Sequence, residues 1–303
     1  MERKDIIAGY LLVAASAVTF AAKGIFAKLL YGYGIDPVTL LALRFSMALP
    51  FFWAAVFFFP SPRVSWRDII YLALSGLLGL YAAALADFYG LIYIDASIER
   101  VILYTYPAIV VVWAAVFFKE QLDRRKGLSL ILTYAGLALV LKITSGVSRA
   151  DATGAVLVLF SAVIYSLSYI LTEFLSRRVS GVKIAAYGTT AATAAFLATW
   201  RGQSVPTEPE VWGLLLALSV VSTFVPVLTL ALGIKRIGAS RAALASFVGP
   251  VSTAVLAWFI LGETLDMVQI AGMGLVIAGV LVISFDKPSR AERGANASRS
   301  RLT

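Results

Sequence analysis

The sequence contains an internal repeat that extends over almost its whole length. A shift of 143 positions places residues 90–122 on residues 233–265 without a gap. Across this shift Gly90, Ile94, Ala96, Ser97, Pro107 and Glu120 fall on Gly233, Ile237, Ala239, Ser240, Pro250 and Glu263. A shift of 145 positions matches the front of each copy, so that residues 9–30 fall on residues 154–175. Two copies of one folding unit are therefore expected, in residues 1–150 and 151–286, followed by a basic disordered tail in residues 287–303.

Composition predicts that both copies lie in a membrane. Of the 303 residues, 60% are hydrophobic and 14% are charged, and the mean hydropathy is +0.88. These values are too apolar for a water-soluble domain. A helix needs roughly 20 apolar residues to cross a bilayer. Ten such stretches lie at about residues 6–30, 38–59, 67–90, 97–118, 126–143, 153–175, 182–200, 210–232, 240–261 and 267–285. The sequence therefore predicts an all-α integral membrane protein with ten transmembrane helices.

The basic residues are unevenly shared between the loops on the two sides of the predicted membrane. Of the 26 lysines and arginines, 19 fall in loops on the side of the N-terminus and four on the other side. Because basic loops stay in the cytoplasm, we expect a multi-pass protein of the inner (plasma) membrane with both termini in the cytoplasm. Five spans in each copy make the second copy inverted. Inverted repeats around a central cavity are typical of carriers, whereas a duplication kept only as a stable bundle is the alternative.

Several of the repeated residues form a recognisable set of motifs. They are Arg44 in LALRF, the Ala-Ser pairs before spans four and nine, Pro107 and Pro250, and Glu120 and Glu263. In this arrangement the chain resembles the EamA family of the drug/metabolite transporter superfamily. The resemblance implies export of small metabolites, often amino acids, through a cavity between the two halves. It does not identify the substrate.

A polar helix face recurs in both copies. Ser16 and Phe20 share one face of the first span with Lys23, and the shift of 145 places them on Ser161 and Tyr165 of the sixth span, with Ser168 in the place of Lys23. Such a face avoids lipid, so it either lines a cavity or bonds to a neighbouring helix. With the aromatic residues nearby, the predicted substrate-binding set is Ser16, Phe20, Tyr104, Ser161, Tyr165, Ser168, Tyr169, Ser246 and Phe247.

Five charged residues of the first copy are expected near the outer side of the membrane. They are Lys23, Arg44, Asp87, Glu99 and Arg100. Helix rise places Lys23 and Asp87 at similar depth, and a buried carboxylate needs a partner, so these two are predicted to pair. The cluster is interpreted as an outer gate or recognition site. The alternatives are a permanent ion-pair network and a proton-coupling site at Asp87 or Glu99.

Three prolines are predicted to kink spans that border the cavity. Pro107 and Pro250 occupy the same position in the two copies, and Pro226 lies in the eighth span. Each removes one backbone donor and frees one carbonyl. The duplication of Pro107 and Pro250 favours a gating role.

The residues that are missing narrow the possible chemistry. The chain has no cysteine and no histidine, which argues against thiol or imidazole catalysis and against zinc, and no phosphate-binding loop is found. We therefore expect no enzyme, no metal and no cofactor. The predicted function is a secondary exporter of small metabolites such as amino acids by alternating access. The alternatives are a proton-coupled exporter of drugs or lipophilic cations and a non-transporting scaffold or receptor. The expected partners are a small-molecule substrate and the bilayer, with no nucleic acid and a monomeric state.

Overall fold

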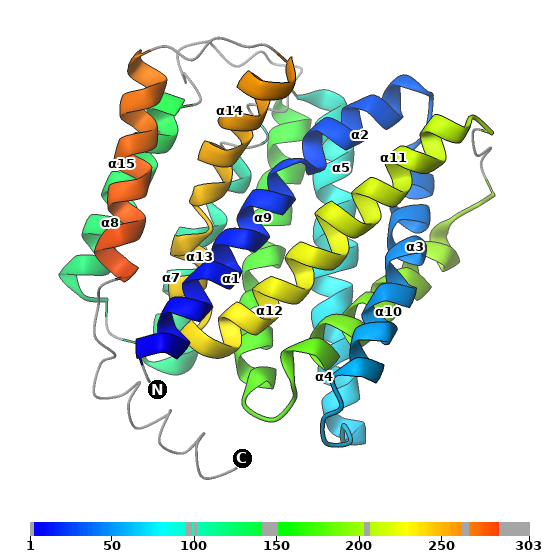
Figure 1. The fold of residues 1–303 in the computed structure, drawn as a ribbon, viewed down its shortest axis with the longest axis horizontal. Coiled ribbons are helices and arrows are strands. Elements are labelled where there is room, and N and C mark those ends of the chain that lie inside the picture. The colour runs from blue at the N-terminus through cyan, green and yellow to red at the C-terminus, as the bar shows by residue number, and fades with distance from the viewer. Residues whose placement is uncertain are drawn as a thin grey trace.

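The computed structural model describes residues 3–94, 99, 102–120, 122–140, 151–202, 207–261 and 267–284. Every regular element in these segments is helical. Arg100, Glu263, the Ala-Ser pair of the first copy and the tail 287–303 lie outside the described residues. The helices run back and forth and form one bundle (Figure 1).

The described part of the first half contains seven α-helices and one π-helical turn. They are α1 (Arg3–Ala21), α2 (Lys23–Gly32), α3 (Pro37–Phe58), α4 (Trp66–Gly76), η1 (Leu77–Ala82), α5 (Ala83–Tyr93), α7 (Tyr106–Phe118) and α8 (Arg124–Val140). The predicted first span is thus broken at Ala22, immediately before Lys23. The predicted third span is continuous but contains the wider turn η1.

The second half repeats this order with some differences. Its elements are α9 (Asp151–Ser176), α10 (Gly181–Thr199), α11 (Pro209–Ser219), η2 (Val220–Phe224), α12 (Val225–Ile237), α13 (Ala239–Ala245), α14 (Val248–Leu261) and α15 (Met267–Ser284). The turns η1 and η2 begin at Leu77 and Val220, which the shift of 143 places on each other. By contrast, α9 runs without a break through the region that corresponds to Ala22.

Side-chain caps explain where several helices begin. Asp36 Oδ1 accepts hydrogen bonds from the backbone N–H groups of Val38 and Thr39 at 3.0 and 3.1 Å, and Pro37 follows it in the first turn of α3. Ser65 accepts the N–H of Asp68 at 3.2 Å and begins α4. Such caps satisfy backbone donors that have no partner inside the helix.

Two of the three prolines lie near the beginnings of helices, which differs from the predicted mid-helix kinks. Pro107 is in the first turn of α7, and Pro250 is the third residue of α14, after a break at Ser246 and Phe247. A proline costs little in the first turn, because that N–H would have no helical partner in any case. Pro226 instead lies inside the continuous helical stretch Pro209–Ile237, directly after η2, where it removes a backbone donor.

The two halves pack closely at equivalent glycines. A Cβ added at Gly9 of α1 would lie 2.5 Å from Ile237 Cγ2 at the end of α12. A Cβ added at Gly154 of α9 would lie 2.7 Å from Ile94 Cγ2 after α5. The two shifts place Gly9 on Gly154 and Ile94 on Ile237. The glycine of each half thus packs against the equivalent isoleucine of the other half. The helices α8 and α15, side by side at one edge (Figure 1), also pack closely at Gly136 and Gly279.

Equivalent helices of the two halves run in opposite directions. Trp200, just after α10, donates a hydrogen bond to Thr39 near the start of α3 at 3.0 Å. At the other end, Lys183 near the start of α10 donates to the carbonyl of Ser61 beyond α3 at 2.9 Å. Since α3 and α10 occupy the same place in the two copies, they are antiparallel counterparts. The helices of the second half therefore cross the bundle in the reverse sense.

Five helical stretches among the described residues are long and apolar enough to cross a membrane. They are Lys4–Gly32, Pro37–Phe58, Trp66–Tyr93, Ala152–Ser176 and Pro209–Ile237. Two shorter apolar helices cover Tyr106–Phe118 and Met267–Val282. The expected number of ten spans stays a prediction. The outer surface carries large apolar side chains such as Phe57, 81% exposed, and Ile131, 68% exposed, as expected of helices that face lipid.

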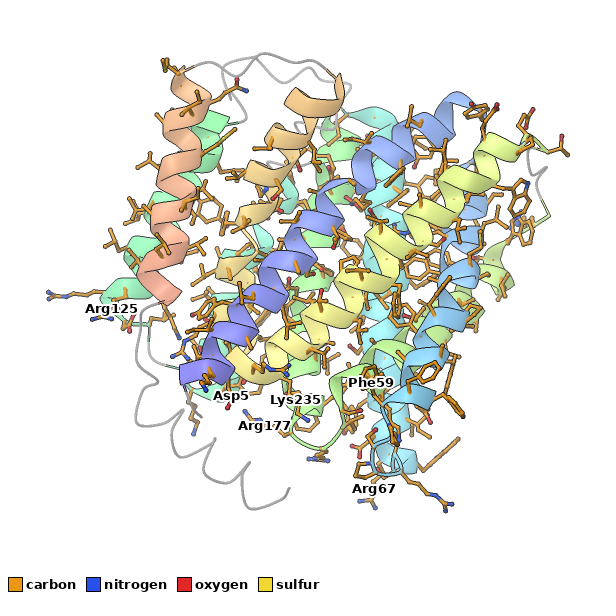
Figure 2. All side chains as sticks on the ribbon, in the orientation of Figure 1. Asp5, Phe59, Arg67, Arg125, Arg177 and Lys235 are labelled. Atoms are coloured by element: carbon orange, nitrogen blue, oxygen red, sulfur yellow. The ribbon has the colours of Figure 1, made fainter. Side chains whose placement is uncertain are left out.

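Charged side chains gather at one end of the bundle. Figure 2 shows Arg67, Arg125, Arg177 and Lys235 at the end where α1 begins, together with Asp5. These residues come from loops or helix ends in both halves. The predicted basic side of the protein is therefore one physical end of the fold.

Candidate functional site

A cavity lies between the two halves of the bundle. Its walls come from α1, α2, α3, η1, α5 and α7 of the first half and from α9, η2 and α12 of the second, with Ser246 between α13 and α14. The empty space, including solvent at its mouth, is about 850 Å³. Of the predicted residues, the cavity is lined by Ser16, Phe20, Lys23, Arg44, Asp87, Tyr104, Ser161, Tyr165, Tyr169, Pro226 and Ser246. A hollow of this size accommodates a small organic molecule.

The two repeated serines line the cavity and also join the halves. Ser16 Oγ donates to the carbonyl of Pro226 at 2.9 Å, and Ser161 Oγ donates to the carbonyl of Ala83 at 2.7 Å. The shift of 143 places Ala83 on Pro226, so the two bonds are counterparts. Both interpretations of the polar face therefore apply at these positions, because each serine borders the cavity while bonding to the facing helix.

Four tyrosines form the part of the cavity wall nearest α7 and α13. Tyr106 packs against Tyr104, Tyr165 and Tyr169, with ring centroids 5.8, 5.2 and 5.4 Å apart. Tyr169 Oη donates to Tyr106 Oη at 3.3 Å and lies 3.4 Å from Ser246 Oγ. The layer thus offers aromatic edges together with hydroxyl groups, which suits a small molecule with both apolar and polar parts.

Two predicted binding residues lie away from this cavity. Phe247 is fully buried in the wall behind Tyr104, with ring centroids 5.7 Å apart, and also packs on Tyr134. Ser168 lines a neighbouring, smaller hollow, and its hydroxyl donates to the carbonyl of Tyr165 at 2.7 Å. Helix spacing placed Ser168 on one face with Ser161 and Tyr165, and the structure divides that face between two hollows.

The predicted ion pair between Lys23 and Asp87 is present. Lys23 Nζ is bonded to Asp87 Oδ2 and also lies 3.7 Å from Glu99 Oε1. Lys23 is only 2% exposed and lies over the rings of Phe20 and Phe88, at 5.0 and 5.3 Å from their centroids. Removing one partner of such a buried ion pair is costly, because the other charge then stays buried without compensation. The cation–π contacts of Lys23 would be lost as well if the lysine were replaced.

Arg44 has different partners from those expected for a member of the charge cluster. Its Nε donates to Thr223 Oγ1 at 2.6 Å, and its Nη2 donates to the carbonyl of Ser222 at 2.7 Å. Ser222 lies four residues before Pro226, whose missing N–H leaves this carbonyl without its usual helical donor. Among the described residues, no carboxylate lies within 4.0 Å of the Arg44 guanidinium. The cluster therefore consists of a Lys23–Asp87–Glu99 group and of Arg44, which bridges to the second half by hydrogen bonds and still interacts electrostatically with Asp87.

Sequence reasoning missed the partners of Arg44, and the predicted binding set did not include Tyr106. Thr223 and Ser222 are polar residues in an apolar span, which was an available signal, but the turn η2 that presents them has no motif of its own. Tyr106 was visible as an aromatic residue beside Pro107. Its counterpart in the second copy is Gly249, where an added Cβ would lie 2.0 Å from Tyr104 Oη. A glycine there leaves space for the phenol.

Comparisons with known proteins agree with this architecture. The model of the EamA-like transporter family matches residues 7–142 and again residues 152–285. The uncharacterized transporter YcbK of Bacillus subtilis is 30% identical over 292 residues, which cover 91% of this chain and 94% of that protein. A protein of known crystal structure has the same fold, with a TM-score of 0.78 at 18% identity, covering 91% of this chain and 98% of that one.

Two further relatives have names that state what they export. The pseudopaline exporter CntI of Pseudomonas aeruginosa is 28% identical over 201 residues, covering 66% of this chain and 70% of that protein. The probable terminal-alkyne amino-acid exporter of Streptantibioticus cattleyicolor is 25% identical over 262 residues, covering 84% and 85%. The family inferred from the repeated motifs is confirmed, and the chain belongs to the EamA-like transporter family as a multi-pass membrane transporter.

Proposed function

We propose that the protein is a secondary carrier that exports small metabolites bearing a carboxylate, such as amino acids, by alternating access. The proposal rests on the position of Arg44 in the cavity wall and on its hydrogen-bond partners. Its guanidinium borders the cavity and, within the described part of the chain, donates hydrogen bonds to the hydroxyl of Thr223 and the carbonyl of Ser222. Asp87 interacts with it electrostatically but forms no direct ion pair with it. A planar guanidinium whose hydrogen bonds go to neutral groups remains able to bind a substrate carboxylate. The name of the amino-acid exporter from Streptantibioticus cattleyicolor supports the same class of substrate.

The tyrosine layer gives the proposed substrate its second point of contact. Tyr165 and Tyr169 line the cavity beside Arg44 and Ser246. An amino acid bound there would direct its carboxylate to Arg44 and its side chain or amine towards the phenol groups. Small-molecule sites of this type combine an apolar wall with a few placed polar groups.

The proposal includes an orientation in the membrane. The end that carries Arg67, Arg125, Arg177 and Lys235 (Figure 2) is assigned to the cytoplasmic side of the inner membrane, since basic segments are retained there. Substrate would then enter at the basic end and leave at the opposite end. The carrier is taken to act as a monomer in the bilayer, without a nucleic-acid partner.

The test is exchange in proteoliposomes with a panel of labelled amino acids, sugars, nucleosides and organic cations, with a pH gradient present or absent. We expect saturable exchange of amino acids by the native protein. Arg44→Gln should abolish it, and Arg44→Lys should retain part of it, because lysine keeps the charge but loses the planar donor arrangement. Thermal unfolding in detergent serves as the control for folding. Amino-acid exchange in a stable Arg44→Gln variant that equals the native rate would contradict the proposal.

A second candidate, proton-coupled export of lipophilic cations, rests on the Lys23 group. One lysine there contacts two carboxylates, Asp87 and Glu99, and Asp87 borders the cavity. The same proteoliposome panel separates the candidates. Movement of cations alone, driven by the pH gradient and lost in Asp87→Asn, would favour this second function.

A further inference from the structure

A second, smaller hollow lies between α4, η1, α9, α10 and α12, and we name it the inner chamber. Ser75, Ser168, Thr172, Ile184 and Ala185 line it without lining the main cavity. Its empty space, open solvent included, is about 480 Å³. Thr172 lies five residues before Arg177, which Figure 2 places at the basic end. A rise of about 1.5 Å per residue therefore puts this part of the chamber within a turn or two of that end.

The inner chamber is the symmetry counterpart of the charged part of the main cavity. Within the main cavity, the relevant lining residues of the first half are Phe20, Lys23, Ala84, Asp87 and Phe88. The shifts of 145 and 143 place them on Tyr165, Ser168, Val227, Leu230 and Ala231, and all five of these line the inner chamber. The repeat that relates the halves thus also relates two hollows, one towards each end of the bundle.

The two chambers differ in charge although they match in position. Among the described residues that line the inner chamber, none is charged, and the polar groups are the hydroxyls of serine, threonine and tyrosine. The position of Lys23 is taken by Ser168 and that of Asp87 by Leu230. An unpaired ion would lose its hydration there without compensation. The chamber therefore suits an uncharged aliphatic or hydroxylated group.

The two hollows meet at a shared wall. Gly79, Leu80, Tyr165, Tyr169, Val227 and Leu230 line both of them. Gly79 faces Ser168 so closely that an added Cβ would lie 2.5 Å from Ser168 Cβ and Oγ. Tyr165 and Tyr169 therefore form part of the wall of both hollows. One molecule bound at this wall would contact both hollows.

A cluster of contacts joins the two halves at the basic end of the chamber. Lys183, which precedes the lining residue Ile184, donates to the carbonyls of Ser61 and Pro62 at 2.9 and 2.7 Å. Ser61 Oγ lies 3.0 Å from Ser180 Oγ in the loop before α10. We name these contacts the loop clasp. It ties the loop between α3 and α4 to the loop between α9 and α10, beside the end of the chamber.

We propose that the inner chamber is a second substrate subsite, reached from the cytoplasm when the loop clasp opens, and that it binds the uncharged side chain of the transported metabolite. This proposal rests on the function proposed above. The substrate carboxylate would be bound beyond the tyrosine wall, at Arg44, while its side chain occupies the inner chamber. Selection of the side chain would then depend on residues of the second half, and recognition of the carboxylate on a residue of the first.

The first experiment measures access without requiring any transport. Because the chain has no cysteine, single cysteines can be placed at Thr172 in the inner chamber, at Ala84 in the main cavity and at Val156 on the lipid-facing surface of α9. A membrane-impermeant maleimide is then added to inside-out or right-side-out vesicles. We expect Thr172→Cys to react from the cytoplasmic side and Val156→Cys to react from neither side. A Thr172→Cys variant that reacts only from the outer side, or not at all, would overturn the proposal even if amino-acid transport is intact.

The second experiment tests whether the inner chamber binds the side chain of a transported amino acid. Leucine should protect Thr172→Cys from the maleimide more strongly than glycine does, because only leucine has a side chain to fill the chamber. Thr172→Phe should reduce leucine export about tenfold relative to glycine export, a typical effect of pocket size. Val156→Phe, on the same helix, is the matched control and should change neither rate. Equal protection by both amino acids, or equal losses for both in Thr172→Phe, would overturn the subsite.

The outcomes for the two proposals are distinguishable. If no amino acid is transported by the native protein, the proposed function fails whatever the labelling shows. If amino acids are exchanged but Thr172→Cys is not reached from the cytoplasm, only the inner subsite fails.

Discussion

The Lys23 group shows how single residues distinguish the two halves. Lys23 and Asp87 pair in a site that is almost fully enclosed, yet the second copy has Ser168 and Leu230 at these positions and forms no such pair. The equivalent position of the second half is therefore built without an ion pair. We infer that the charges of the Lys23 group contribute more than helix packing.

A double-mutant cycle tests this interpretation. Lys23→Ser should destabilise the protein by about 3–5 kcal/mol, because it leaves Asp87 buried without its cation. Lys23→Ser combined with Asp87→Leu reproduces the second-copy residues and should recover the part of that loss that comes from Asp87, while Glu99 still lacks Lys23. The measurement is the free energy of unfolding in detergent. Losses that simply add in the double variant would show that the two side chains are not coupled.

At residue scale, sequence predicted the Lys23–Asp87 pair but not the partners of Arg44. Helix rise alone gives the depth of a residue, which was enough to bring Lys23 and Asp87 to the same level. The direction of Arg44 depends on how α3 faces η2, and on a carbonyl of Ser222 that is available because Pro226 cannot donate to it. Such information arises only when helices from both halves are assembled.

At the scale of elements, the sequence predicted two similar halves and disturbed helices at the three prolines, but not the break at Ala22 or the turns η1 and η2. The close contacts of Gly9 with Ile237 and of Gly154 with Ile94 lie at positions related by the two shifts. Apolar composition is continuous through η1 and η2, and the single charge of Lys23 after Ala22 did not indicate a break in the first span. Hydropathy indicates where a span lies, whereas its hydrogen-bond pattern depends on the neighbouring helices.

The glycine contacts can be tested in matched variants. Gly9→Ala and Gly154→Ala should each cost about 1–3 kcal/mol, because the added Cβ would press on a branched side chain and nearby backbone. The two losses should be similar, since the contacts are symmetry counterparts. Gly213→Ala in α11 is the control, as nothing lies within 4 Å of its added Cβ; it should stabilise the helix by about 0.5–1 kcal/mol. Thermal unfolding in detergent measures all three, and a neutral Gly154→Ala would contradict the close packing.

At the scale of the whole molecule, the two hollows and the loop clasp are consistent with two states of the carrier. The charged part of the main cavity and the inner chamber occupy equivalent places in the two halves. If the two halves exchanged conformations, the hollow that is open to one side of the membrane would close and the other would open. In the structure described here, the loop clasp holds the halves together at the basic end. In the proposed opening of the inner chamber to the cytoplasm, Lys183 leaves the carbonyls of Ser61 and Pro62.

Loss of the loop clasp should shift the population towards the state that is open to the cytoplasm. In Lys183→Met the two bonds from the ammonium group are lost. If they are together worth about 1–2 kcal/mol in this partly exposed setting, alkylation of Thr172→Cys from the cytoplasmic side should rise about 5- to 30-fold. Arg67→Met removes a positive charge at the same end and is the control. An unchanged rate in Lys183→Met would show that the loop clasp does not limit opening.

The glycine contacts between the halves also have a consequence for biosynthesis. Gly9 is covered by the end of α12, and Gly90 is covered by Val158 and Gly154 of α9. The packing surface of each half is therefore buried only when the other half is present. When synthesis has reached the end of α8, the first half still lacks the helices that cover α1 and α5. A stable product should therefore form only after the last helices have been inserted. The two halves, expressed as separate chains, should accumulate together and be degraded when made alone.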